Sequence, residues 1–185
     1  EPGGEVPASR IFFRGNPESP REEVEPAEIT VLQRAMEKAT IPPHREEGRE
    51  TTGRRLTYAR HLTAGGHPLT ARVFVNRVWS HHFGRGLVAT PGDFGVAGER
   101  PSHPELLDWL ARDFMQHGWN LKRLHRMILL SRTYRQSSRR RAEHDRVDPE
   151  NILLGRANLR RLEAEAIRDA LLTVSGKIDL ALGGV

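Results

Sequence analysis

The residues best suited to chemistry gather in one glycine-rich stretch, HHFGRGLVATPGDFGVAGERPSHPE, which spans residues 81–105. Two histidines open the stretch, Asp93 lies in its middle and His103 stands near its end. A histidine and a carboxylate within hydrogen-bonding reach can exchange protons near neutral pH, as a general acid and base do during hydrolysis. The candidate catalytic residues are therefore His82, His103 and Asp93, together with Glu163 further along the chain.

The same stretch has the ingredients of an anion-binding site. Arg85 and Arg100 border flexible glycines, and a helix is expected to begin near Ser102, where free backbone N–H groups attract anions. A purely structural interpretation, in which the stretch only connects two helices, stays open. The candidate ligand-binding residues in and before the stretch are Asn76, Arg77, Trp79, His81, Arg85, Asp93, Arg100 and His103.

Other chemistries find less support in the residue spacing. His81 and His82 are neighbours and project about 100° apart on a helix, which makes them a poor pair for one metal ion, so no metal site is predicted. Neither a GxxxxGK[ST] phosphate loop nor a GxSxG nucleophile elbow occurs. The basic run at 137–146 includes two acidic residues and lacks an aromatic residue for base stacking, so nucleic-acid binding is only a minor alternative.

The composition limits the classes of protein further. The 185 residues carry a formal net charge of +5, and nearly all of the positive charge is arginine, which suits bidentate contacts to sulfate, phosphate or carboxylate. The absence of cysteine excludes disulfides, thiolate zinc sites and c-type haem attachment within this sequence, so no cofactor is predicted here. No apolar run approaches the roughly 20 residues that a membrane span needs.

The elements that must position these residues fall into two parts. Residues 1–55 are rich in Pro, Glu and Arg and predict an extended arm and linker, with a short strand at 10–13, turns and extended chain at 16–26, and a short helix at 26–38. From residue 56 onward the pattern becomes helical. The predicted helices span 55–64, 67–83, 104–117, 120–131 and 160–176.

Local signals mark where these helices begin and end. Gly84 should stop the second helix, and the residues from Ser102 to Glu105 have the spacing of a capping box for the third. The predicted fold is mainly α: a compact multi-helix domain of about five helices over residues 56–185, with an N-terminal extended arm and a long glycine-rich loop.

A few polar residues fall among apolar ones when these sequences are projected on a helical wheel. Asn76 and His82 lie on apolar sides of the helix at 67–83, and each must find a partner, such as the backbone of the glycine-rich loop or a ligand. His125 lies at the border of the apolar stripe of its helix. Glu163 projects into the apolar stripe of the last helix, where a carboxylate needs a nearby arginine or takes a raised pKa.

Several long motifs resemble one family, the planctomycete-type domain of unknown function 1553. These motifs are RGNPESPREEVEP (14–26), PLTARVFVNRVWSHHFGRGLVATPGDFGVAGERPSHPELLDWLA (68–111), LHRMILLSRTYRQSS (124–138) and DPENILLGRANLRRLEAEAIRDALL (148–172). The family usually has glycine where this chain has Arg21, and its domain continues beyond the point where this sequence ends.

The resemblance implies a module of large exported bacterial proteins, located outside the cytoplasm. Its partners would be neighbouring domains of the same longer chain, including a cytochrome-c-like module that carries haem, and sometimes carbohydrate-binding modules. The resemblance assigns no activity. We therefore expect a module that binds an anionic polysaccharide or a partner domain through the glycine-rich loop; the alternatives are a hydrolytic enzyme using a His/carboxylate pair and a nucleic-acid-binding domain.

Overall fold

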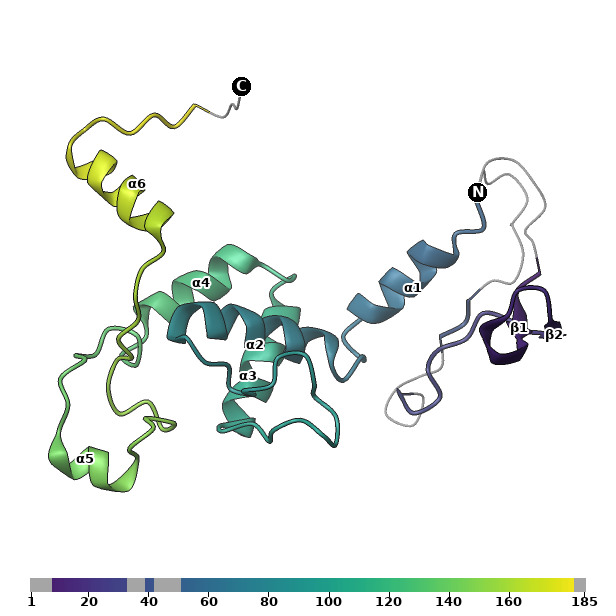
Figure 1. Ribbon diagram of the computed structural model, residues 1–185, viewed down its shortest axis with the longest axis horizontal. Coiled ribbons are helices and arrows are strands. Elements are labelled where there is room, and N and C mark those ends of the chain that lie inside the picture. Colours follow the sequence, from purple (N-terminus) through teal and green to yellow (C-terminus); the bar gives the residue numbers. More distant parts are fainter. Residues whose placement is uncertain (1–7, 33–38, 42–50, 182–185) are drawn as a thin grey trace. The chain divides into compact units, whose positions relative to one another are not determined.

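The computed structural model describes residues 8–32, 39–41 and 51–181. The chain forms two compact units, Glu1–Ile128 and Leu129–Val185, each of which is described by itself. Within the described ranges there are six α-helices and one two-stranded hairpin, so the prediction of a mainly α fold is confirmed (Figure 1). The domain boundary predicted after residue 55 stays a prediction.

The arm contains the predicted strand. Strand β1 (Arg10–Phe12) pairs in antiparallel fashion with β2 (Pro20–Glu23), and the short 3-10 helix η1 (Phe13–Gly15) starts the turn between them. The guanidinium of Arg21 lies over the ring of Phe13 at 4.4 Å from its centroid, so the arginine packs on the hairpin.

The helix predicted to start at residue 26 is wrong for residues 26–32, which form no α-helix; residues 33–38 lie outside the described part of the chain. The side chain of Glu28 provides a physical reason. Its Oε1 accepts the N–H of Ile29 at 3.1 Å, and such local side-chain bonds compete with helical backbone bonds.

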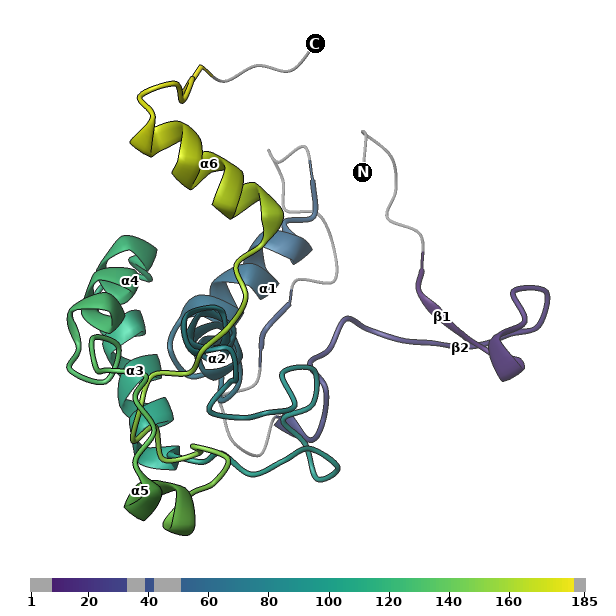
Figure 2. The same cartoon turned by 60° about the vertical axis from the view of Figure 1, so that its left-hand side comes forward.

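The first unit is built around α2 (Thr70–Phe83), which packs against α3 (Pro104–Gln116). Figure 2 shows the two helices side by side, with α1 (Arg54–Thr63) and α4 (Leu121–Leu130) also in this unit. All four agree with the predicted spans to within a few residues. The buried apolar side chains of these elements are Ala71, Val75, Val78, Trp79, Phe83, Leu107, Leu110, Ala111, Phe114, Leu124 and Ile128.

The start of α3 differs from its prediction. His103 occupies the N-cap position, Pro104 opens the helix, and no side chain caps it, so the expected capping box is absent. Ser102 instead donates both its backbone N–H and its hydroxyl to the carbonyl of Leu87, at 2.8 and 3.2 Å. The serine therefore closes the two ends of the glycine-rich loop (residues 84–103) on each other, as in an Ω-loop.

One completely buried amide fastens this loop to α2. The Nδ2 of Asn76 donates to the carbonyl of Val88, and its Oδ1 accepts the N–H of Val88, both at 2.9 Å. Gly86 permits the approach, because a Cβ there would lie 2.5 Å from the Val88 carbonyl oxygen and 2.8 Å from the Asn76 amide. Asn76 therefore satisfies its polar atoms with loop backbone, which was one of the two roles left open.

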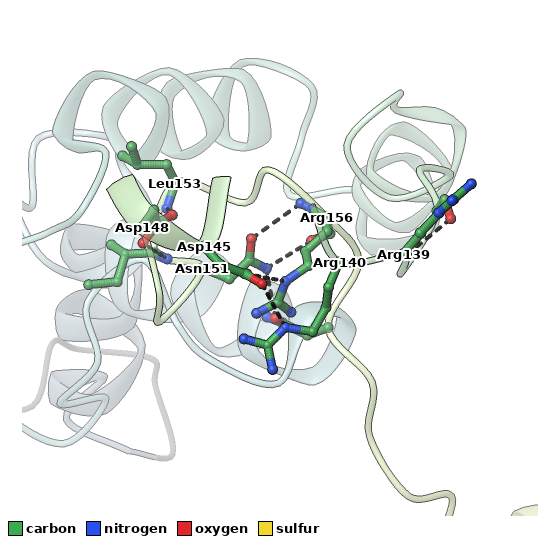
Figure 3. A network of polar contacts seen from close by, with 10 residues as sticks. Arg139, Arg140, Asp145, Asp148, Asn151, Leu153 and Arg156 are labelled. Carbon is green, nitrogen blue, oxygen red and sulfur yellow. Dashed lines mark hydrogen bonds and ion pairs between the residues drawn. The ribbon is translucent and has the colours of Figure 1, made fainter. Parts of the chain in front are cut away.

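Polar contacts rather than apolar burial organise the second unit, which contains α5 (Ala142–Val147) and α6 (Ala164–Val174). Asn151, its one buried residue among those described, donates to the Arg156 carbonyl and to Asn158 Oδ1, both at 2.8 Å (Figure 3). Asp148 accepts the N–H groups of Ile152 and Leu153 at 2.8 and 2.7 Å. The sequence did not predict α5.

The last helix is shorter than predicted, and the predicted position of Glu163 within it is wrong. Glu163 is the exposed N-cap residue rather than part of the helix, and α6 buries none of its side chains in the described structure. The expectation that this carboxylate faces an apolar core is therefore wrong, because its unit provides no such core around α6.

The loop attachment gives the first testable prediction. Asn76→Ala should lower the free energy of unfolding by about 2–4 kcal/mol, because it leaves the N–H and C=O of Val88 buried without partners. Gly86→Ala should lower it by about 1–3 kcal/mol through overpacking. Urea denaturation measures both, with Gly92→Ala as the matched control, since a Cβ at Gly92 meets no atom within 4 Å. Equal stability of all three variants would contradict the attachment.

Candidate functional site

Two neighbouring cavities in the first unit form the candidate site. Their volumes are about 360 and 370 Å³, and both are lined by Pro68, Arg72 and Asp108. We call the two together the Arg72–Asp108 groove. The first cavity is also lined by Gly65, Gly66, His67, Ala71, Ala111, Arg112 and Met115, and the second by Leu69, Val88, Phe94, Glu99, Pro101, Pro104 and Leu107.

An ion pair between α2 and α3 stands where the cavities meet. The Nε of Arg72 donates to Asp108 Oδ1 at 2.6 Å, and the same guanidinium donates to the carbonyl of Pro68. The hydrogen bond from Arg72 lowers the pKa of Asp108, and the charges of Arg72 and Arg112 act in the same direction. Asp108 is therefore ionised at neutral pH, and its side chain remains half exposed, which leaves acceptor positions for a ligand.

His67 forms part of the groove wall in a neutral state. Its Nδ1 accepts the backbone N–H groups of Leu69 and Thr70, at 3.2 and 3.1 Å, where α2 begins. A ring nitrogen that accepts hydrogen bonds carries no proton, so the proton belongs on Nε2. Burial lowers the pKa of His67, which favours the same neutral form. The ring thus offers one N–H donor without a positive charge.

The glycine-rich loop supplies the far wall of the groove. Because Asn76 and Ser102 hold its two ends, the loop brings Val88, Phe94 and Glu99 over the beginnings of α2 and α3. Its middle is also ordered internally: Thr90 Oγ1 donates to the Asp93 carbonyl at 2.8 Å and accepts the N–H of Glu99 at 3.0 Å. The loop therefore makes a concave surface together with its own helix.

The predicted site residues do not line this concave surface. Asp93 uses its carboxylate to accept the N–H of Gly95 at 2.7 Å, and His103 lies 3.0 Å from the hydroxyl of Ser102. Neither residue lines the two cavities of this unit or the third cavity described, about 280 Å³, which belongs to the second unit. Glu163 is also outside all three.

The remaining candidates are divided between core and surface. Trp79 is 6% exposed and stacks on Phe83 at 4.1 Å between ring centroids, so it belongs to the core. Arg85 pairs with Glu99 at 3.3 Å. Arg77, His81 and Arg100 are exposed.

His82 meets a histidine from another helix. Its Nε2 lies 2.7 Å from Nδ1 of His125 on α4, the ring centroids are 5.0 Å apart and the ring planes are inclined by 67°. Both side chains are half-buried. The two residues are 43 positions apart, so no short-range sequence pattern announces the pair.

A histidine–carboxylate pair does occur, but it involves residues that the sequence analysis missed. Glu28, whose side chain is fully buried, accepts the hydroxyl of Tyr58 at 3.0 Å, and its Oε2 lies 3.3 Å from Nε2 of His61. Burial, together with the hydrogen bond to Glu28, raises the pKa of Tyr58. Tyr58 and His61 are three residues apart and share one face of α1, so the sequence could have indicated this pair. Their partner Glu28 is 30 residues or more away, and no sequence pattern indicates it.

Among the described residues, no group of three or more His, Cys, Asp or Glu side chains is placed to hold a metal ion. None of the helices described is both long and apolar enough to cross a membrane.

Comparison with known proteins identifies the family of this chain. The family model PSD1, described as "Protein of unknown function (DUF1553)", matches residues 54–185, more than half of the chain. The chain belongs to the DUF1553 family. The match includes all six helices and the whole groove, whereas the arm with Glu28 precedes it. No curated protein and no solved structure matches the chain.

The state of His67 gives the second prediction. Because the pKa of His67 is lower in the folded chain than its ordinary value of 6.5, the unfolded chain binds more protons below that pH. The stability that the neutral ring contributes is complete above pH 6.5 and is lost as the pH falls through that value toward the folded pKa. His67→Asn should therefore reduce the loss of unfolding free energy between about pH 7.5 and about pH 5.5. His67→Gln, which also removes the titrating ring, should give the same reduction; an unchanged pH dependence in both variants would contradict the assignment.

Proposed function

We propose that this DUF1553 domain is a polysaccharide-binding module of an exported multidomain protein, and that the Arg72–Asp108 groove takes an anionic polysaccharide. The observation that carries the proposal is the pair of adjacent cavities on either side of one ion pair. Two cavities in a row suit a polymer, because successive sugar units can occupy neighbouring positions. The exported, multidomain setting rests on the family resemblance.

The chemistry of the groove suits the surface of a sugar. Sugar rings present hydroxyl groups at their edges and C–H groups on their faces. Arg72, Asp108 and the Nε2–H of His67 supply donors and acceptors for hydroxyls, held in place by their own hydrogen bonds. Phe94 and prolines of the second cavity supply the apolar surface that a C–H face needs.

The charge balance favours an anionic polymer over a neutral one. Glu99 is neutralised by Arg85 and Asp108 by Arg72. Arg112 lines the first cavity, and Arg100 stands between two residues that line the second. Among the described residues neither of these two exposed arginines forms an ion pair, so both are positioned to meet sulfate or carboxylate groups.

The hydrolytic alternative has less support. The histidine and carboxylate candidates from the sequence do not meet in the groove, and the Glu28–His61 pair does not line it either. No observation on the described residues favours the nucleic-acid alternative.

A second function is favoured by one specific surface, the apolar face of α6. Ile167, Leu171 and Val174 follow the i, i+4, i+7 spacing of a helix face, and they are 43%, 67% and 90% exposed. Full burial of such side chains is worth about 1.5–3 kcal/mol each. We propose that a neighbouring domain covers this face, so that the module also docks within a larger protein.

Glycan binding is tested on a heparin-type oligosaccharide by calorimetry at low salt. Arg100→Gln combined with Arg112→Gln should raise Kd at least about tenfold, because two charge-assisted contacts are lost. The matched control, Arg77→Gln with Arg126→Gln, removes two exposed arginines of the same unit that line neither cavity and should leave Kd within about twofold. Equal losses in the two double variants would mean diffuse charge attraction and would reject the groove.

Docking through α6 is tested by amide hydrogen exchange. In the 185-residue chain the amides of α6 should exchange almost as fast as in an unfolded peptide, because an 11-residue helix without buried side chains is marginal in water. In a chain that includes the neighbouring domain they should exchange about a hundredfold more slowly. The amides of α3 serve as the control and should be protected in both. Similar exchange of α6 in the two chains would contradict docking.

A further inference from the structure

The pair formed by His82 and His125 lies outside the groove and plays no part in the proposed function. Its two facing nitrogens, Nε2 and Nδ1, are 2.7 Å apart. At this distance only one hydrogen atom fits between the two nitrogens. One nitrogen therefore donates it, and the lone pair of the other nitrogen accepts it. Two half-buried imidazoles from different helices thus direct one nitrogen each at the other.

We propose that this pair binds a divalent transition-metal ion of the kind that imidazole prefers, namely Cu²⁺, Ni²⁺ or Zn²⁺. His82 would bind the ion through Nε2 and His125 through Nδ1. The imidazole that donates the present hydrogen bond moves its proton to its other ring nitrogen through solvent, so two neutral rings bind the ion with no net release of protons.

The distance between the two nitrogens requires only a small adjustment. Metal–nitrogen bonds of about 2.0–2.1 Å place two ligating nitrogens roughly 3 Å apart, a few tenths of an ångström more than their present separation. The rings must also turn, so that both lone pairs meet at the ion instead of facing each other, and rotation of the two half-buried side chains provides this change. The backbones can stay in place, because the buried side chains of α2 and α4, including Val78, Phe83 and Leu124, hold both helices in the core.

The surroundings define what kind of site this is. Among the described residues, no third His, Asp, Glu or Cys joins the pair. His81 projects about 100° away from its neighbour His82 and is not a ligand. Water therefore completes the coordination, so binding is of modest affinity and the ion exchanges readily. The ion would connect α2 to α4.

Thermal unfolding of the whole chain tests the site with NiCl₂ and, separately, ZnCl₂. A ligand that binds only the folded state raises Tm, so both salts should raise it, whereas MgCl₂ at the same concentration should not, because Mg²⁺ prefers oxygen ligands. His82→Gln and His125→Gln should each raise the Kd for Ni²⁺ at least about tenfold. His81→Gln and His117→Gln are the matched controls and should leave it within about twofold.

A spectroscopic measurement keeps the test independent of how well the variants fold. With one equivalent of Cu²⁺, the wild-type chain should give an electron paramagnetic resonance spectrum with coupling to two imidazole nitrogens. Coupling to one nitrogen, or a Tm that none of the metal salts raises, would overturn the proposal and leave the pair as an imidazole–imidazole hydrogen bond. Equal loss of Ni²⁺ affinity in the His81 control would also overturn it.

Discussion

The buried amide of Asn76 is the contact on which the rest of the first unit depends. It pairs with the peptide group of Val88 as one backbone group pairs with another, which removes two polar groups from water without leaving either unsatisfied. This pairing allows Leu87 and Val88 to join the core at 2% exposure although they belong to a loop. Ser102 then closes the loop on the Leu87 carbonyl. The concave surface over α2 and α3 follows from these two attachments.

The position of the Arg72–Asp108 pair on that concave surface determines what the pair can do. An ion pair that is partly exposed adds little to stability, about 0–1 kcal/mol. Placed between two cavities, however, it provides a donor and an acceptor whose orientation is already set before a ligand arrives. The neutral His67 adds a donor without adding charge. Preorganised polar groups beside apolar walls are what a binding site for a polyhydroxylated molecule requires, and this is why we propose binding, rather than proton transfer, for the groove.

The second unit follows a different principle. Asn151 and Asp148 tie a short segment together by bonding to its backbone, and Asn151 adopts a left-handed conformation with φ of 54° to do so. Side chain–backbone hydrogen bonds of this kind specify a local shape without an apolar core. The apolar residues Ile167, Leu171 and Val174 of α6 stay exposed, and exposed apolar surface of this kind is typical of docking sites.

The sequence by itself determined the helices and most of their ends, because the signals are local. Gly84 stops α2 with φ of 82°, and Pro104 opens α3, as expected. It also identified the family and the polar residues that need partners, such as Asn76 and His82. Tertiary structure alone decided those partners: Val88 for Asn76, His125 for His82, and Asp108 for Arg72. The apolar setting expected for Glu163 failed because no side chain of α6 is buried, whereas the helix expected from residue 26 failed because Glu28 bonds locally to the N–H of Ile29. Periodicity records which side of a helix is apolar, whereas the residues that meet that side are chosen by packing across dozens of positions.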